Sequence, residues 1–279
     1  MSPLEALFVI LAALFLTAVA RWVLQWLYGH TLRDLLTDHD NPAIGLAVAG
    51  YLFGVVWTIA VLLSAPSRGL WQDVLDVLLY GGVGIVLLTA VALGTCRVFL
   101  GMPVRPQLEA RNVAAAVVVA AVYAATSLTY SGALSGEGGG FGILLLFFVL
   151  GQLALLGVTY VFRWLTGYDD VREIAAGNLA TGLALAGLLV GVGIVVAWAV
   201  SGDYLGLGES LLHFLLALAF VALFYPVRQV VVQTLLLGGP LRWRGSLLDE
   251  EVARDRNVAA GFMEAVAYVA TALFLTFMF

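Results

Sequence analysis

Four asparagines and one glutamate are the polar side chains of this sequence whose spacing could support chemistry inside apolar segments. Each Asn stands at the start of a long apolar run, and Glu264 lies seven residues after the last one; the asparagines are Asn41, Asn112, Asn178 and Asn257. Seven helical residues rise about 10 Å, close to two turns, so Glu264 shares a helix face with the last Asn. A buried carboxylate there either lines a hydrated path or bonds to an Arg, Tyr or Asn of a neighbouring helix.

The asparagines also fit a purely structural role. An Asn at a helix start accepts hydrogen bonds from first-turn amides, and Pro42 occupies the favoured first helical position after Asn41. Capping is therefore the simpler interpretation for Asn41 and Asn178. Charged residues precede Asn112 and Asn257, where a helix can already be running, so a bridging amide or a polar path is the competing interpretation. Helix N-termini that converge from one side could also attract an anion.

A second set of polar residues flanks the long third and seventh apolar segments. The outer ends carry Asp73, Asp76, Glu209 and His213. These four are most simply interfacial, and an acidic vestibule for cations is the alternative. Arg97 and Arg228, near the inner ends of the same segments, are expected to extend toward the membrane surface.

No motif indicates an enzyme. The sequence has no phosphate-binding loop, no His-Glu-x-x-His motif, and no serine or cysteine with an evident base. Its three histidines are scattered, at His30, His39 and His213, and Cys96 is the single cysteine. The sequence therefore predicts no catalytic residue, no metal site, no cofactor and no intrachain disulfide.

Composition places these residues in a membrane. Apolar residues make up 62% of the chain and charged residues 11%, against roughly 25% charge in soluble domains. Eight apolar stretches reach the roughly 20 residues that a helix needs to cross a bilayer. They cover residues 4–28, 41–63, 72–100, 112–131, 142–166, 176–200, 209–237 and 257–279. The predicted fold is all-α and polytopic; the bilayer is the expected partner, and no nucleic acid is expected.

The marked segments indicate a duplication. Glycines follow Asn41 and Asn178 at the same offsets, in a register of 137 residues, as Gly45, Gly50 and Gly54 and as Gly182, Gly187 and Gly191. The Gly-rich stretch 132–141 separates a first unit, 1–131, from a second, 142–279. Four helices in each unit give both units the same orientation. The sequence thus predicts two parallel four-helix repeats with a pseudo-twofold axis along the membrane normal.

The repeated glycines favour close helix packing. Gly50 and Gly54, like Gly187 and Gly191, have the GxxxG spacing that lets two helices approach each other in lipid. We therefore expect the spans 41–63 and 176–200 to contact each other at a central interface.

Basic residues predict the orientation. All thirteen are Arg, and twelve flank the odd-to-even connections, with only Arg68 on the other side. The positive-inside rule places those connections in the cytoplasm and both termini outside. The first span is expected to be a retained helix, because Met-Ser-Pro-Leu-Glu lacks the positive residue of a signal peptide.

The Asn-x-Ala-x-Gly and Asn-Val-Ala-Ala-Gly segments resemble a bacterial inner-membrane family known as domain of unknown function 350, in two copies. The matching residues are Asn41, Ala43, Gly45, Gly50, Gly54, Asn112, Ala114, Ala115, Asn178, Ala180, Gly182, Gly187, Gly191, Asn257, Ala259, Ala260 and Gly261, and Ala116 departs from a family-like glycine. The resemblance supplies no catalytic residue. It implies a small multi-helix membrane protein, sometimes encoded beside phage-shock-type envelope stress proteins, and a homo-oligomer of which this chain is a covalent version.

Two functional hypotheses follow. The first is a channel-like or ion- or small-solute-transporting element of the inner membrane, linked to envelope stress, with a path lined by the even spans. The second is a non-conducting scaffold or stress sensor whose loops recruit a peripheral cytoplasmic stress protein. A hydrated cavity at Asn257 and Glu264 would favour the first hypothesis, and a dry helix contact there would favour the second.

Overall fold

The computed structural model describes residues 3–28, 33–136 and 138–278, so His30 lies outside the described residues. Over these ranges the chain is an all-α membrane protein with eight helices long and apolar enough to span a bilayer. The spans are α1 Pro3–Tyr28, α2 Pro42–Ser64, α3 Leu70–Leu100, α5 Val113–Ser135, α6 Gly140–Leu165, α8 Leu179–Val200, the segment Leu207–Leu236, and α12 Val258–Met278. The eight predicted spans are confirmed.

The seventh span is not one regular helix. It consists of α9 Leu207–Ala219, the 3-10 turn η2 Phe220–Leu223, α10 Phe224–Val227 and the π-helix η3 Arg228–Leu236. Pro226 has no N–H to donate and its ring crowds the preceding turn, which accounts for a change of helix type around it.

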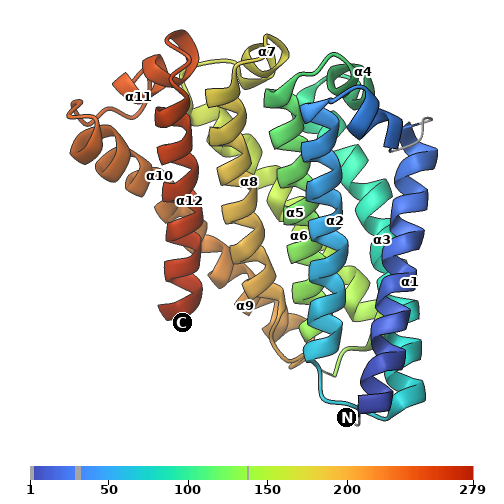
Figure 1. The fold of residues 1–279 in the computed structure, drawn as a ribbon. Coiled ribbons are helices and arrows are strands. Elements are labelled where there is room, and N and C mark those ends of the chain that lie inside the picture. The colour runs from blue at the N-terminus through green and yellow to red at the C-terminus, as the bar shows by residue number, and fades with distance from the viewer. Residues whose placement is uncertain (1–2, 29–32, 137, 279) are drawn as a thin grey trace.

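Short helical segments gather at one end of the molecule, where the odd-to-even connections lie. They are η1 Asp34–Asp38, α4 Val104–Glu109, α7 Asp170–Ala175, and α11 Leu247–Asp249 with η4 Glu250–Arg254. Figure 1 shows α4, α7 and α11 at this end, and the start of α1 and the end of α12 at the other. We call this end the asparagine face, because Asn41, Asn112, Asn178 and Asn257 lie there at the starts of α2, α5, α8 and α12.

The four even spans stand in one row, in the order α2, α5, α8, α12 (Figure 1). Behind this row, α3 contacts α2 and α5, and α6 contacts α5 and α8. The first span, α1, stands beside α2 and packs on α2 and α3. The two central members are the most enclosed, with 72% of the apolar window of α5 buried and 67% of that of α8, against 39% or less in every other span.

Glycine makes the close contacts of the row. A Cβ added at Gly50 would overlap the Cα of Ala120 in α5, and one added at Gly187 would overlap the Cα of Ala265 in α12. Added Cβ atoms on Gly54 and Gly191 would have their nearest neighbours at 2.9 and 3.0 Å. Among the described residues, one on Gly45 would meet only a Leu36 methyl, at 3.7 Å. Small residues thus bring neighbouring backbones together, as in other membrane helix pairs.

The expected contact between the second and sixth spans is wrong. Gly50 and Gly54 of α2 face α5 and α3. Gly187 and Gly191 of α8 face α12 and the α10 segment. The halves instead meet through α5 and α8, where an added Cβ on Gly193 would lie 2.9 Å from the Cα of Ala125. The reason is that α5 lies between α2 and α8 in the row.

Both repeats run in the same direction, since α2 and α8 each begin at the asparagine face. The connection between the repeats is shorter than the predicted stretch 132–141, because α5 continues to Ser135 and α6 begins at Gly140. Gly132 remains helical and close-packed: an added Cβ there would lie 2.7 Å from the Cα of Ala197 in α8.

Lipid contact follows from the outward-facing side chains. Large apolar residues are exposed around the molecule, and Trp22, Trp26, Trp71 and Trp164 are among the most exposed. The 31 residues of α3 rise about 46 Å, more than a hydrocarbon core of about 30 Å, so this helix tilts or protrudes.

The close packing of the row predicts that two glycine-to-alanine changes differ sharply in their effect on the free energy of unfolding. Gly187→Ala should lower the free energy of unfolding by about 1–3 kcal/mol, because the new methyl forces α8 away from α12. Gly94→Ala in α3, where nothing lies within 4 Å, should be neutral or stabilise by up to about 1 kcal/mol. Thermal denaturation of the two variants in the same detergent measures this difference; equal midpoints would show that the contact is not tight.

Candidate functional site

A fully buried arginine is the centre of the most polar region within the described spans. Arg228 begins the π-helix η3, just after Pro226, and its side chain has 0% exposure. The prediction that Arg228 extends toward the membrane surface is therefore wrong. Arg97 of α3, by contrast, is exposed. A buried guanidinium needs ionic and hydrogen-bonding partners, because an unpaired charge in this environment is costly.

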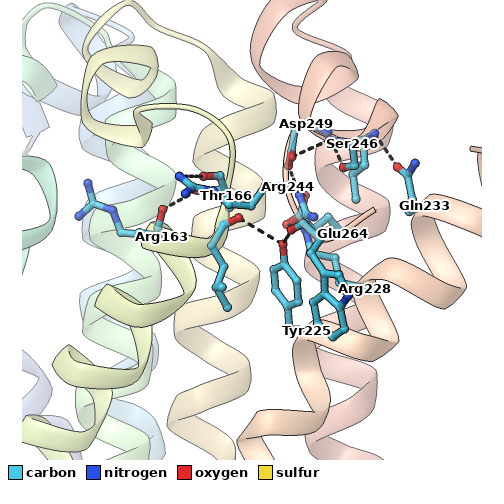
Figure 2. Close-up of polar contacts among 12 residues, drawn as sticks. Arg163, Thr166, Tyr225, Arg228, Gln233, Arg244, Ser246, Asp249 and Glu264 are labelled. Atoms are coloured by element: carbon cyan, nitrogen blue, oxygen red, sulfur yellow. Dashed lines mark hydrogen bonds and ion pairs between the residues drawn. The ribbon is translucent and has the colours of Figure 1, made fainter. Parts of the chain in front are cut away.

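Two carboxylates supply those partners (Figure 2). Arg228 Nε donates to Glu264 Oε1 at 2.6 Å, and Arg228 Nη2 donates to Asp249 Oδ1 at 2.7 Å. The Tyr268 hydroxyl, one turn further along α12, donates to Glu264 Oε1 at 2.9 Å. Both carboxylates are at least 95% buried. We call Arg228, Asp249 and Glu264 the ionic triad.

Local structure fixes the position of Asp249. Ser246 and Asp249 form a capping box at the start of α11, in which the Ser246 amide donates to Asp249 Oδ2 at 3.0 Å. Gln233 of η3 accepts from the Leu248 amide at 2.7 Å and donates to Pro240 O at 3.0 Å. These bonds hold the connection between η3 and α11 against the end of the seventh span (Figure 2).

The triad belongs to the second repeat alone. The positions 145 residues earlier are Val104 for Asp249, Val119 for Glu264 and Tyr123 for Tyr268. Val119 is buried among apolar residues in the first repeat. The sequence singled out Glu264 and its bond to a neighbouring Arg or Tyr as one alternative, but it missed Asp249. A usable signal was available, since a carboxylate inside a span requires a cation nearby and Arg228 lies in the preceding span.

All four asparagines cap their helices. The side-chain oxygen accepts from an amide of the first turn at 3.0 Å for Asn41, 3.1 Å for Asn112, 3.3 Å for Asn178 and 3.1 Å for Asn257. The residue before each Asn has a positive φ, at Asp40, Arg111, Gly177 and Arg256. Capping therefore holds for Asn112 and Asn257 as well, because the chain turns sharply before them and the preceding short helix does not continue.

Three of these asparagines also bond to the next connection in the chain. Asn41 Nδ2 donates to Leu108 O at 2.9 Å, Asn112 Nδ2 to Ile174 O at 2.8 Å, and Asn178 Nδ2 to Val252 O at 2.9 Å. We call this series the asparagine ladder. The amide of Asn257 donates instead to Glu251 within its own connection, at 2.8 Å. Asn257 therefore caps α12 near the protein surface, and Glu264 forms an ion pair. Both side chains bond directly to other groups of the protein.

The opposite face has a cavity of about 230 Å³ between the two repeats. Asp76 and His213 line it, whereas Asp73 and Glu209 are not among the residues around it. Asp76 pairs with Arg68, and Asp73 accepts from the Arg68 amide at 2.9 Å. The structure therefore brings together half of the predicted vestibule residues and neutralises Asp76. Within the described ranges, no three His, Cys, Asp or Glu side chains gather as metal ligands would.

A second arginine, Arg163, forms an ion pair within the second repeat and a hydrogen bond to the first repeat at the asparagine face. Arg163 Nε donates to Asp170 Oδ2 at 3.1 Å, and Arg163 Nη1 donates to Phe99 O of α3 at 3.1 Å. Burial raises the pKa of Asp170 to about 6, although Arg163 opposes the shift. This arginine therefore links α6 both to α7 and to the end of α3.

The ionic triad predicts how charge removal changes stability. Arg228→Met should lower the free energy of unfolding by about 3–5 kcal/mol, because two buried carboxylates lose their cation. The double change Arg228→Met/Glu264→Val should recover part of that loss, since it removes one of the two carboxylates together with the guanidinium. Denaturation of each variant in one detergent measures the effect.

Arg97→Met is the matched control, because Arg97 is exposed near the equivalent end of α3, and it should change the free energy by less than about 0.5 kcal/mol. A wild-type midpoint for Arg228→Met, or a double variant less stable than Arg228→Met, would contradict the assignment of the triad.

Comparison with known proteins agrees with this duplicated architecture. A family model described as Domain of Unknown Function (DUF350) matches residues 1–134 and again residues 138–279. The chain is 22% identical over 272 residues to a UPF0719 transmembrane protein of Aquifex aeolicus (strain VF5), covering 94% of this chain and 96% of that one. No solved structure matches. The chain therefore belongs to the DUF350 family and carries two copies of its domain in tandem.

Proposed function

We propose that this protein is a non-conducting membrane scaffold whose asparagine face holds a peripheral protein. The observation that carries the proposal is the direct contact of α5 with α8, where a path between the repeats would run. Added Cβ atoms on Gly132, Gly182 and Gly193 would all lie within 3.0 Å of the opposing backbone. Such a contact leaves no room for a hydrated ion.

The asparagine face supports the proposal because its parts are held together. The asparagine ladder bonds α2, α5 and α8 each to the next connection, so α4, α7 and η4 sit in fixed positions relative to the row. These segments display charges of both signs, among them the pairs Arg105–Glu109 at 2.7 Å and Arg254–Glu250 at 3.2 Å. A preorganised polar surface reduces the entropy lost when a partner docks.

The location of the partner is part of the same proposal. Because most arginines lie toward the asparagine face, the positive-inside rule places that face in the cytoplasm and both termini outside. The membrane would be a bacterial inner membrane and the partner a cytoplasmic protein of envelope stress, as the family resemblance implies. The proposal assigns no catalytic role to the chain.

A channel-like element that conducts ions or small solutes is the second candidate. One observation favours it: the cavity of about 230 Å³ at the opposite face lies between the repeats and is lined by Asp76 and His213. The same α5–α8 contact stands between this cavity and the asparagine face.

Ion flux through reconstituted protein separates the two candidates. Proteoliposomes that contain the wild-type chain should leak ions no faster than protein-free liposomes over a range of voltage and pH, because the α5–α8 contact excludes water. Gramicidin added at the end confirms that the vesicles can report a flux. The channel would be supported, and the scaffold contradicted, by two results together. Wild-type flux would exceed the protein-free rate, and the cavity-lining change Asp76→Asn would alter that flux.

Partner retention tests the scaffold directly. In membranes washed after cross-linking, Arg105→Glu/Arg254→Glu should lower the recovery of a peripheral cytosolic protein several-fold, since both side chains are exposed on the asparagine face. Arg68→Glu, a single charge reversal at the opposite face, is the control and should leave recovery unchanged. Equal recovery from all three proteins would remove the support for docking at this face.

A further inference from the structure

The contacts within the row of even helices repeat in one register, counted from each capping Asn. The residue two positions after the Asn meets the residue four positions after the next Asn: Ala114 contacts Gly182, and Ala180 contacts Gly261. The residue nine positions after the Asn meets the residue eight positions after the next one: Gly50 contacts Ala120, and Gly187 contacts Ala265. The same interface therefore forms between successive hairpins.

Each contact has a direction. The asparagine ladder runs from each hairpin to the one that follows it, from Asn41 to Leu108, from Asn112 to Ile174 and from Asn178 to Val252. Arginine side chains bond in the opposite direction, to the preceding hairpin: Arg111 donates to His39 O and Arg256 donates to Ala176 O. Each even helix therefore has a forward surface, at offsets of two and nine residues from its Asn, and a backward surface, at offsets of four and eight.

The forward surface of the last helix is unpartnered. Ala43, Ala114 and Ala180, each two positions after a capping Asn, are at most 1% exposed, but the equivalent Ala259 of α12 is exposed. Val266, at the offset of Gly50 and Gly187, is 48% exposed. The side-chain amide of Asn257, the last of the four capping residues, bonds within its own connection.

On the backward surface of α2, the first even helix, no backbone among the described residues packs against Gly45. Gly182 and Gly261 press against the backbone of the preceding even helix. Among the described residues, an added Cβ on the equivalent Gly45 of α2 would meet only a Leu36 methyl, at 3.7 Å. Ala49, equivalent to the contacting residues Ala120 and Ala265, is exposed. Although α1 packs on α2 and α3, it leaves this side of α2 open.

We propose that a second copy of this chain continues the row, with the forward surface of α12 in one molecule packed on the backward surface of α2 in the next. In this register Ala259 meets Gly45, and Val266 faces Ala49 across a wider gap, because it carries a side chain where Gly50 and Gly187 allow close approach inside the chain. The two surfaces correspond in position to the two sides of the contact that joins consecutive even helices within the chain. Small residues also let such helices approach closely in lipid, where packing drives association.

This contact is head-to-tail and not symmetric. A symmetric pair would place α12 against α12 or α2 against α2, and the internal interface has no such form. Head-to-tail contacts build a ring when the rotation between copies closes and an open array when it does not. The proposal is independent of whether the asparagine face holds a peripheral partner.

Disulfide cross-linking distinguishes these arrangements. In a Cys96→Ala background, chains with Ala49→Cys and chains with Val266→Cys are co-expressed and oxidised in native membranes. A cross-linked dimer should form in the mixture and be absent from either variant expressed alone, and the double variant Ala49→Cys/Val266→Cys should give a series of multimers. Val86→Cys with Leu153→Cys, both exposed on other helices, is the control pair and should remain monomeric.

Dimers from either single variant, or no dimer in the mixture, would overturn the proposal. Native mass spectrometry in mild detergent provides a second measurement that needs no cysteine. The wild-type chain should appear as an oligomer, and Gly45→Leu should shift it to the monomer with its helix content unchanged, because among the described residues an added Cβ on Gly45 meets only a Leu36 methyl, at 3.7 Å. A wild-type chain that appears as a monomer in this measurement, without cross-linking, would also contradict the proposal.

Discussion

Direct contact between helix backbones is the constraint on which this structure depends. In lipid no hydrophobic force draws two helices together, so close packing and hydrogen bonds must do so. The even helices meet this requirement with Gly opposite Ala at successive contacts, as at Gly50 and Ala120 and again at Gly187 and Ala265. The asparagine ladder adds hydrogen bonds at the helix starts, where first-turn amides and the carbonyls of the short helices would otherwise lack partners. The row of helices, the fixed asparagine face and the open ends all follow from this one repeated contact.

The second repeat departs from the first where a charge is buried. Valines occupy the first-repeat positions that correspond to Asp249 and Glu264. A buried ion pair is weak evidence of added stability, because desolvation offsets much of the attraction between the charges. The triad does fix the relative positions of three segments. Arg228 joins the irregular seventh span to α11 through a bond of 2.7 Å and to α12 through a bond of 2.6 Å. The triad thus ties the last hairpin together just where Pro226 interrupts its helix.

Much of the fold could be predicted from the sequence, because the strongest signals are local. Span length and composition located all eight helices, and the repeated offsets of Gly and Asn revealed the duplication. The neighbours of each helix could not be read in the same way. GxxxG spacing at Gly187 and Gly191 shows that a helix approaches closely but does not say which one, and the expected partner α2 proved to be separated from α8 by α5. The partners of Glu264 were also out of reach, since Asp249 becomes a neighbour only after the chain folds back through α11.

The central feature of this structure is that α2 and α12 stand at opposite ends of one row. A pulsed electron paramagnetic resonance measurement tests this claim, with spin labels at Leu63 of α2 and Phe277 of α12, both exposed at the end opposite the asparagine face. Labelled chains are diluted with unlabelled protein so that only distances within one molecule contribute. Helices in contact lie about 8–10 Å apart, so three steps along the row predict a distance of roughly 25–30 Å. A distance near one helix spacing would mean that the row closes on itself, and it would contradict both the dry central contact and the open ends described here.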